Sequence, residues 1–173
     1  MSAMMEIAER MSEGTGSRGA LSIAEILDRL DGLQAVPDSV LAGQPKTVAA
    51  DLLAMGEDIL DAWLRAGGSE PTLKKSEGFR LLAMHRQASR GDPSFNACRE
   101  TCREIVFHHN VVLGDPAAPA VARTLRLGAM VVRHLALFVG GKLENAGLGE
   151  FCCSSRGIRQ SDDAVAGRMK TVQ

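Results

Sequence analysis

The sequence predicts an all-α fold: an antiparallel bundle of four to five helices followed by a flexible C-terminal tail. Apolar residues recur at spacings of three and four along most of the chain, and no segment alternates regularly between apolar and polar residues. The tripeptide Gly-Asp-Pro occurs twice and is typical of a break between helices. Because short connections favour antiparallel neighbours, consecutive helices are expected to run up and down the bundle.

The first two predicted helices are separated by a loop. The first begins after Ser22, because Glu25 is placed three residues later to complete a capping box. A loop is expected at 32–45, followed by a helix at 46–66 whose apolar residues lie on one side. Gly67 and the glycine after it end this helix, since glycine adopts a left-handed C-terminal conformation without strain.

The two Gly-Asp-Pro segments, which start at Gly91 and Gly114, divide the rest of the bundle into three helices. Each segment supplies a helix stop, an N-cap residue and a proline suited to a first helical turn. The last helix is expected to be central, because a helix this apolar must be buried on several sides or pair with a second subunit. The three predicted helices cover 76–90, 93–113 and 118–145.

Length and composition restrict the class of protein. The chain has 173 residues, 45% of them hydrophobic, which suits one domain that folds without a stabilising metal or disulfide. The net charge of −1 does not favour a general nucleic-acid binder, and a helix-turn-helix around Gly91 is compatible with the sequence but not favoured by it. The predicted organisation is a flexible segment at 1–21, the helical bundle at 22–150 and a mobile tail at 151–173.

The beginning of the chain and its cysteines predict a cytoplasmic protein. Three glutamates, Glu6, Glu9 and Glu13, interrupt the apolar run that a secretory signal needs. The most apolar stretch, 127–139, is much shorter than the about 20 residues of a membrane-spanning helix. The four cysteines are not dispersed as in a disulfide framework, so we expect reduced thiols and no membrane span.

Cys98 and Cys102 are the strongest candidates for chemistry. At a spacing of four on one helix their side chains lie about 6 Å apart, close enough for both thiolates to bind one zinc or iron ion. Antiparallel packing allows neighbouring helices and the tail to supply further ligands. The competing interpretation is that both cysteines fill core positions, and we favour it because free cysteine is often buried. The further ligands predicted for a metal site are His85 and one of His134, Cys152 or Cys153.

Charge is distributed unevenly along the chain. Residues 1–70 carry 12 acidic and 5 basic side chains, whereas residues 71–173 carry 9 acidic and 15 basic ones. Either the two halves pack against each other, or the second half offers a basic face to an acidic partner or an anion. The arginines that we expect to remain exposed, and so to contact a protein partner with an acidic surface, are Arg99, Arg103, Arg123, Arg126 and Arg133.

No motif in the sequence indicates an enzyme, because a nucleophile–base pair, a phosphate-binding loop and a dinucleotide fingerprint are all missing. We therefore favour a regulatory or accessory protein that binds another protein, as a homodimer through its later helices and without a cofactor. The alternative hypothesis is a metal-binding or redox-responsive helical protein. It would use the Cys98–Cys102 pair with zinc or iron.

Overall fold

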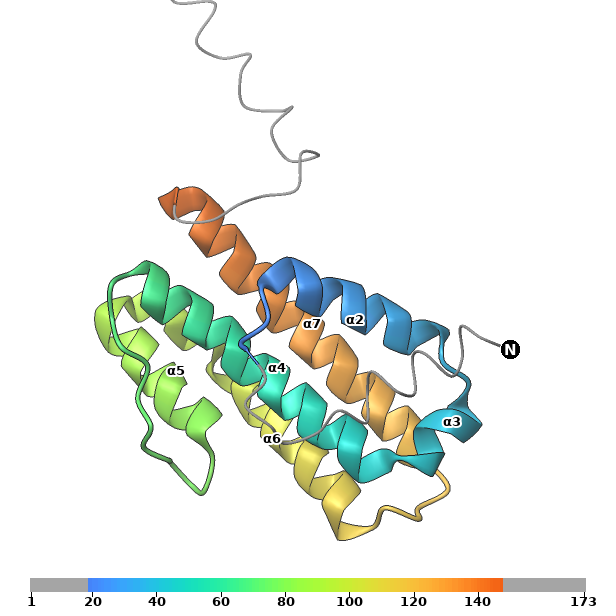
Figure 1. Cartoon of the computed structure of the whole chain (residues 1–173). Helices are drawn as coiled ribbons and strands as arrows, with labels where there is room; N and C mark the ends of the chain where they lie inside the picture. The colour runs from blue at the N-terminus through green and yellow to red at the C-terminus, as the bar shows by residue number, and fades with distance from the viewer. Residues whose placement is uncertain (1–18, 148–173) are drawn as a thin grey trace, which may run out of the picture.

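Six α-helices and one short 3₁₀-helix form the part of the chain that the computed structural model describes, residues 19–147 (Figure 1). Within this range the structure contains no β-strand, so the all-α prediction is confirmed. In chain order the helices are α2 (Ile23–Ala35), α3 (Asp38–Gly43), α4 (Pro45–Ala66), α5 (Arg80–Gly91), the 3₁₀-helix η1 (Pro93–Cys98), α6 (Arg99–Gly114) and α7 (Val121–Ala146).

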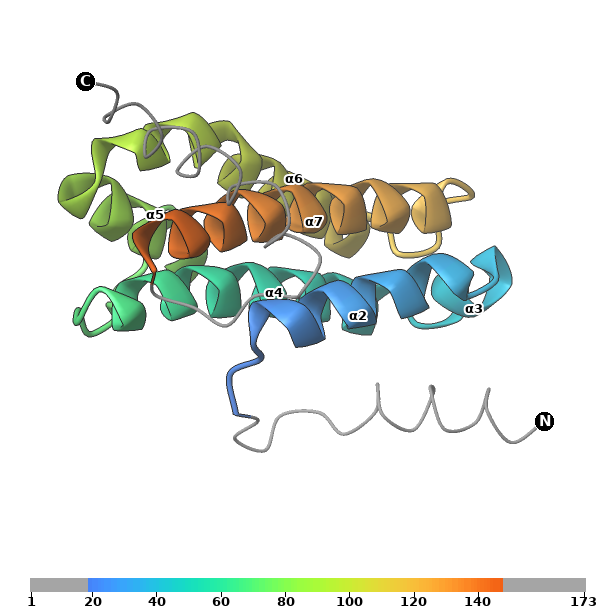
Figure 2. The same cartoon turned by 90° about the horizontal axis from the view of Figure 1, so that it is seen from above.

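The three longest helices, α4, α6 and α7, all pack against one another and enclose most of the core. Helices α2 and α3 lie against α7 and α4, and α5 packs on α4 at the end of the bundle where α7 finishes (Figures 1 and 2). Figure 2 shows α6 and α7 in one layer, above α4 and α2. The layer of α6 and α7 therefore has one side against the core and another that no described helix covers.

Helix α2 begins where the sequence predicts. The Ser22 hydroxyl accepts a hydrogen bond from the Glu25 backbone N–H at 3.2 Å, and the Glu25 carboxylate accepts one from the Ser22 backbone N–H at 2.8 Å. These two bonds are the predicted capping box, and they satisfy backbone donors that an uncapped helix leaves unpaired. The Glu25 carboxylate accepts a further hydrogen bond from the Ser22 hydroxyl at 2.7 Å, and this bond and the one from the Ser22 backbone N–H lower the pKa of Glu25, because both favour its charged form.

The loop predicted at 32–45 is wrong, because most of this segment is helical. Helix α2 continues to Ala35, which buries Leu33 in the core, and α3 buries Leu41 in the same way. Burial of these two leucines stabilises helical structure in a segment that contains Gly32 and Pro37. Gly32 lies inside α2, and Pro37 is the N-cap of α3.

The helix predicted at 76–90 begins four residues later than expected, at Arg80. Ser76 and Phe79 exchange backbone hydrogen bonds of 3.0 Å in each direction and close a tight turn. The two residues between them have positive φ, +55° at Glu77 and +85° at Gly78. Glycine adopts this conformation freely, but a glutamate does so uncommonly.

Both Gly-Asp-Pro segments separate helices as predicted, but the segment after the first one is not a single helix. Pro93 begins six residues of 3₁₀-helix, and the α-helical part starts at Arg99. The Asp92 side chain caps η1 by accepting from the Ser94 backbone N–H at 3.0 Å. Phe95 is fully buried, with its ring centroid 4.9 Å from that of Trp63 on α4, and anchors η1 to the bundle.

Helix α7 begins at Val121 and occupies the central position that the sequence predicts. Among the helices that the structure describes, it alone combines a length and an apolar composition sufficient to cross a membrane. The central helix of a bundle has the same properties. Ten residues of α7, Val121 and Leu125 among them, are buried against the other helices. The predicted flexible ends, apart from residues 19–21, lie outside the described residues.

Candidate functional site

The structure brings His85 to the predicted cysteine pair. The His85 imidazole Nε2 lies 2.8 Å from the Phe95 carbonyl oxygen, and the Cys98 thiol donates to the same oxygen at 3.2 Å. Because a carbonyl oxygen only accepts, Nε2 carries a proton in this arrangement. Counting residues back from the Gly91 turn predicts this neighbourhood, since α5 returns antiparallel to the segment that carries the cysteines.

Cys98 and Cys102 are free thiols in the core, 2% and 0% exposed. The pKa of the Cys98 thiol is lowered, most strongly by its hydrogen bond with Cys102 and less strongly by His85, although burial acts in the opposite direction. The pKa of Cys102 is raised by Cys98 and by burial. The pKa of His85 is raised, first by its interaction with Cys98 and then by the Phe95 carbonyl, against the effect of burial.

The predicted metal site is not assembled within residues 19–147. In this part of the chain no three histidine, cysteine, aspartate or glutamate side chains are placed to hold a metal ion. His134 is exposed on α7 and lines a groove with Glu104 and His108, away from the cysteines. Cys152 and Cys153 lie outside the described residues, so their predicted part in a metal site stays a prediction.

Three of the five predicted contact arginines form ion pairs within the chain. Arg103 binds both carboxylate oxygens of Glu77, at 3.2 and 3.1 Å. Arg133 pairs with Asp31 of α2. The Arg133–Asp31 pair connects the basic second half of the chain to its acidic first half, which is one of the two arrangements that the charge distribution predicts, whereas Arg103 and Glu77 both belong to the second half.

Arg126 of α7 holds the connection between α2 and α3. Its guanidinium binds the Asp38 carboxylate at 2.6 and 2.8 Å and donates to the Val36 carbonyl at 2.7 Å. It also donates to the carbonyls of Leu33 and Gln34, at 3.5 and 3.2 Å. The end of a helix leaves such carbonyls without partners, so Arg126 acts as a C-terminal cap from a distant helix.

Arg99 and Arg123 are exposed, and no ion pair joins either of them to another residue in the described range. They are therefore the two predicted contact arginines whose guanidinium groups are available to bind another molecule. Contact between this set of arginines and an acidic partner stays a prediction.

A groove that the sequence did not predict lies between α6 and α7. Its volume is about 560 Å³, and apolar residues with large exposed fractions line it. Phe107 and Met130 are each 59% exposed, and Leu127 is 40% exposed. Leu137 (58%) and Val111 (42%) continue the same exposed rows. We call this surface the α6–α7 face and define it by Phe107, Val111, Leu127, Met130 and Leu137.

A regular spacing in the sequence could have revealed the α6–α7 face. On α7, residues 123, 127, 130, 134 and 137 alternate steps of four and three, which places them in one row along the helix. Residues 100, 104, 107 and 111 form a matching row on α6. Because apolar residues are generally expected in the core, the apolar content of these helices does not by itself separate this second, outward row from the buried row.

His108 forms part of the floor of the groove. Its Cβ packs against α7 at Gly128, where an added Cβ would lie 3.4 Å away. Burial lowers the pKa of His108, and Glu104 raises it by a smaller amount. The buried Nδ1 atom has no hydrogen-bond partner among the described residues. The groove therefore has an imidazole with a lowered pKa in its floor, among apolar side chains such as Phe107 and Met130 and polar ones such as Glu104.

Comparisons of the chain with protein-family models, with curated proteins and with solved structures find no match.

Proposed function

We propose that the protein works by binding another protein and that it forms a homodimer through the α6–α7 face. The supporting observation is that exposed apolar side chains on two adjacent helices gather on one face, with His134 between Met130 and Leu137, on a side of the bundle that no described helix covers. Exposed apolar rows of this kind commonly mark interaction surfaces. A second pair of helices could fill the groove as a helix fills the space between two others in a bundle.

Charge complementarity supports a second copy of this chain as the occupant. Glu100 and Glu104 are exposed at one end of the α6 row, and Arg123 is exposed in the α7 row. Because α6 and α7 are antiparallel, the glutamates and the arginine lie toward opposite ends of the α6–α7 face. A twofold axis that lies in the interface, at the middle of the face and perpendicular to the helices, would therefore place the acidic end of one copy over the basic end of the other.

The experiment is co-purification of two differently tagged, full-length copies expressed in one cell. We expect the wild-type copies to co-purify. Met130→Glu, carried by both copies, should reduce the recovered partner at least tenfold, because it buries two carboxylates in an apolar contact. Leu73→Glu is the matched control: Leu73 is 85% exposed but lies in the segment between α4 and α5, so recovery should not change.

Equal recovery of the Met130→Glu and Leu73→Glu copies would contradict the proposed interface. Failure of the wild-type copies to co-purify would contradict the homodimer itself. Neutral phospholipid vesicles provide a third comparison, since lipid could also cover an apolar face. If the wild-type chain floats with such vesicles and Met130→Glu does not, the face contacts lipid and the proposal is wrong.

A further inference from the structure

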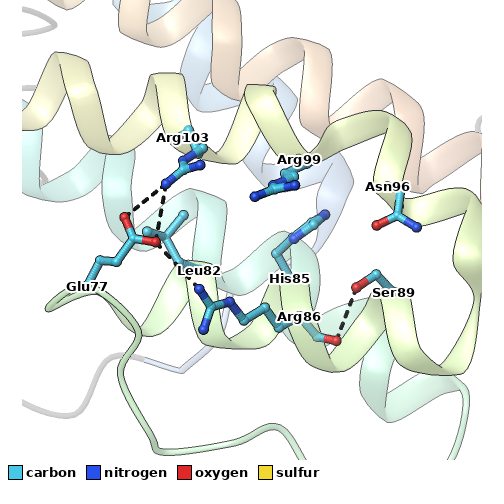
Figure 3. A pocket seen from close by; sticks show the side chains of 8 residues that line it. All are labelled: Glu77, Leu82, His85, Arg86, Ser89, Asn96, Arg99 and Arg103. Carbon is cyan, nitrogen blue, oxygen red and sulfur yellow. Dashed lines mark hydrogen bonds and ion pairs between the residues drawn. The ribbon is translucent and has the colours of Figure 1, made fainter.

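A second pocket, distinct from the groove, lies between α5 and the segment formed by η1 and α6 (Figure 3). Its volume is about 210 Å³. Figure 3 shows that Glu77, from the tight turn before α5, closes one end of the pocket, and that Asn96 and Ser89 lie at the other end. The wall between the two ends carries arginines from both helical segments.

Positive charge exceeds negative charge in this pocket. Three guanidinium groups line it, those of Arg86, Arg99 and Arg103, whereas Glu77 supplies the single lining carboxylate. Glu77 lies 3.1 Å from Arg103 and 3.5 Å from Arg86. One carboxylate therefore balances one of three cations, so the lining retains two positive charges when His85 is neutral.

Arg99 carries charge that no described residue neutralises. It is exposed, and its guanidinium lies beside His85 on the pocket wall (Figure 3). The nearness of Arg99 opposes protonation of His85, as expected for two cations close together. An anion bound between them would relieve this repulsion.

The conformation of Glu77 is the second observation that concerns the pocket. Its φ of +55° is uncommon for a residue other than glycine. The turn from Ser76 to Phe79 holds this conformation and directs the Glu77 carboxylate onto Arg103. The carboxylate occupies the position on Arg86 and Arg103 that an incoming oxyanion would take, and it thus acts as an internal competitor.

We propose that this pocket binds a small free oxyanion of the phosphate type, either inorganic phosphate or a small phosphate monoester. Arg99 is the primary contact, because its fork of N–H donors matches the oxygens of phosphate. When Glu77 moves away from Arg86 and Arg103, these two arginines also bind the phosphate. Asn96 and Ser89 offer hydrogen bonds to the organic substituent of a phosphate monoester. The pocket is smaller than the usual 300–1,000 Å³ or so of cofactor sites, which favours a small ligand over a nucleotide. This site does not depend on the proposed homodimer.

The experiment titrates inorganic phosphate into the full-length protein and follows backbone amide resonances by NMR. Glycerol phosphate, succinate and sodium chloride at equal ionic strength are the comparison ligands. We expect phosphate and glycerol phosphate to shift resonances around His85 and Arg99, and chloride to leave them unchanged. Arg99→Gln should weaken phosphate binding at least tenfold, and Glu77→Gln should strengthen it several-fold by removing the competing charge.

Arg90→Gln is the matched control, because Arg90 is an exposed arginine of α5 that does not line the pocket. Its phosphate affinity should stay within twofold of the wild-type value. Equal weakening in Arg90→Gln and Arg99→Gln, or equal shifts with chloride, would overturn the proposal. Tenfold tighter binding of a phosphoserine peptide than of glycerol phosphate would also overturn it, since the ligand would then be a modified protein.

Discussion

Phe107 of α6 and Met130 of α7 line the same groove, and each leaves 59% of its surface exposed. Neither residue contributes to the core, although both lie on helices whose other sides are deeply buried. Two large apolar side chains on adjacent helices expose a surface that association can remove from water. This relationship is the basis of the proposed homodimer.

Arg126→Ala should destabilise the fold. The substitution removes the ion pair with Asp38 and leaves the carbonyls at the end of α2 without their donor. Hydrogen bonds to charged groups contribute about 1.5–3 kcal/mol each when buried, and Arg126 is partly exposed, so we expect a loss of about 1–3 kcal/mol. Urea unfolding followed by circular dichroism measures it. Arg90→Ala should change stability by less than about 0.5 kcal/mol, and an equal loss in both variants would refute the capping role.

Gly128→Val should weaken the packing of α7 on α4 and α6. A Cβ at Gly128 would lie 3.3 Å from Leu52 Cδ1 and 3.4 Å from His108 Cβ, so a branched side chain must push the helices apart. Overpacking of this kind costs about 1–3 kcal/mol. Gly141 on the same helix has no atom within 4 Å of an added Cβ, and Gly141→Ala should stabilise by up to about 1 kcal/mol. Thermal unfolding that showed the same sign for both variants would contradict this account.

Lys142→Met should raise the pKa of Asp92. Lys142 binds the Asp92 carboxylate at 2.8 Å, and together with Ser94 it lowers the pKa of Asp92 to about 2. Without the ammonium group, the carboxyl titration followed by NMR should move toward its ordinary value of 3.8. The interaction stabilises the wild-type fold above that value and is lost as the pH falls through about 2. Lys75→Met is the control, and an unchanged Asp92 titration in Lys142→Met would disprove the assignment.

His108 should make the fold less stable in acid. Burial lowers its pKa below the ordinary value of 6.5, so the unfolded chain binds a proton more readily than the folded one. The free energy of unfolding should therefore decrease as the pH falls from 6.5 through the folded pKa of His108. In His108→Gln this part of the pH dependence should be absent. Parallel stability curves for the wild type and His108→Gln over that range would show that the group does not titrate as described.

The sequence predicts most of the helices because their signals are local. The Ser22 capping box and both Gly-Asp-Pro breaks lie where residue spacing and cap chemistry place them. The errors occur where distant residues decide the local conformation. Residues around Leu33 and Leu41 become helical because their side chains are buried and Arg126, far away in the sequence, caps the connection between them.

The candidate sites were harder to predict than the fold. Counting residues back from the Gly91 turn places His85 at the same height along the bundle as Cys98. The structure confirms that the two residues are neighbours, because both contact the Phe95 carbonyl oxygen. The same counting, made forward from the Gly114 turn, gives the level of His134 along α7 but not the side on which it lies, and the structure places His134 in the groove with Glu104 and His108. The pocket around Arg99 depends on Glu77 and on the tight turn that holds it. The spacing of apolar residues along the sequence does not predict such a turn.

Sedimentation equilibrium of the full-length chain tests the homodimer most directly. We predict a mass of twice 18.4 kDa for the wild type and for Leu73→Glu at micromolar concentration, and a mass of 18.4 kDa for Met130→Glu. Circular dichroism should show the same helical content for all three proteins. A wild-type mass of 18.4 kDa, or a Met130→Glu mass equal to that of the wild type, would contradict the proposed interface.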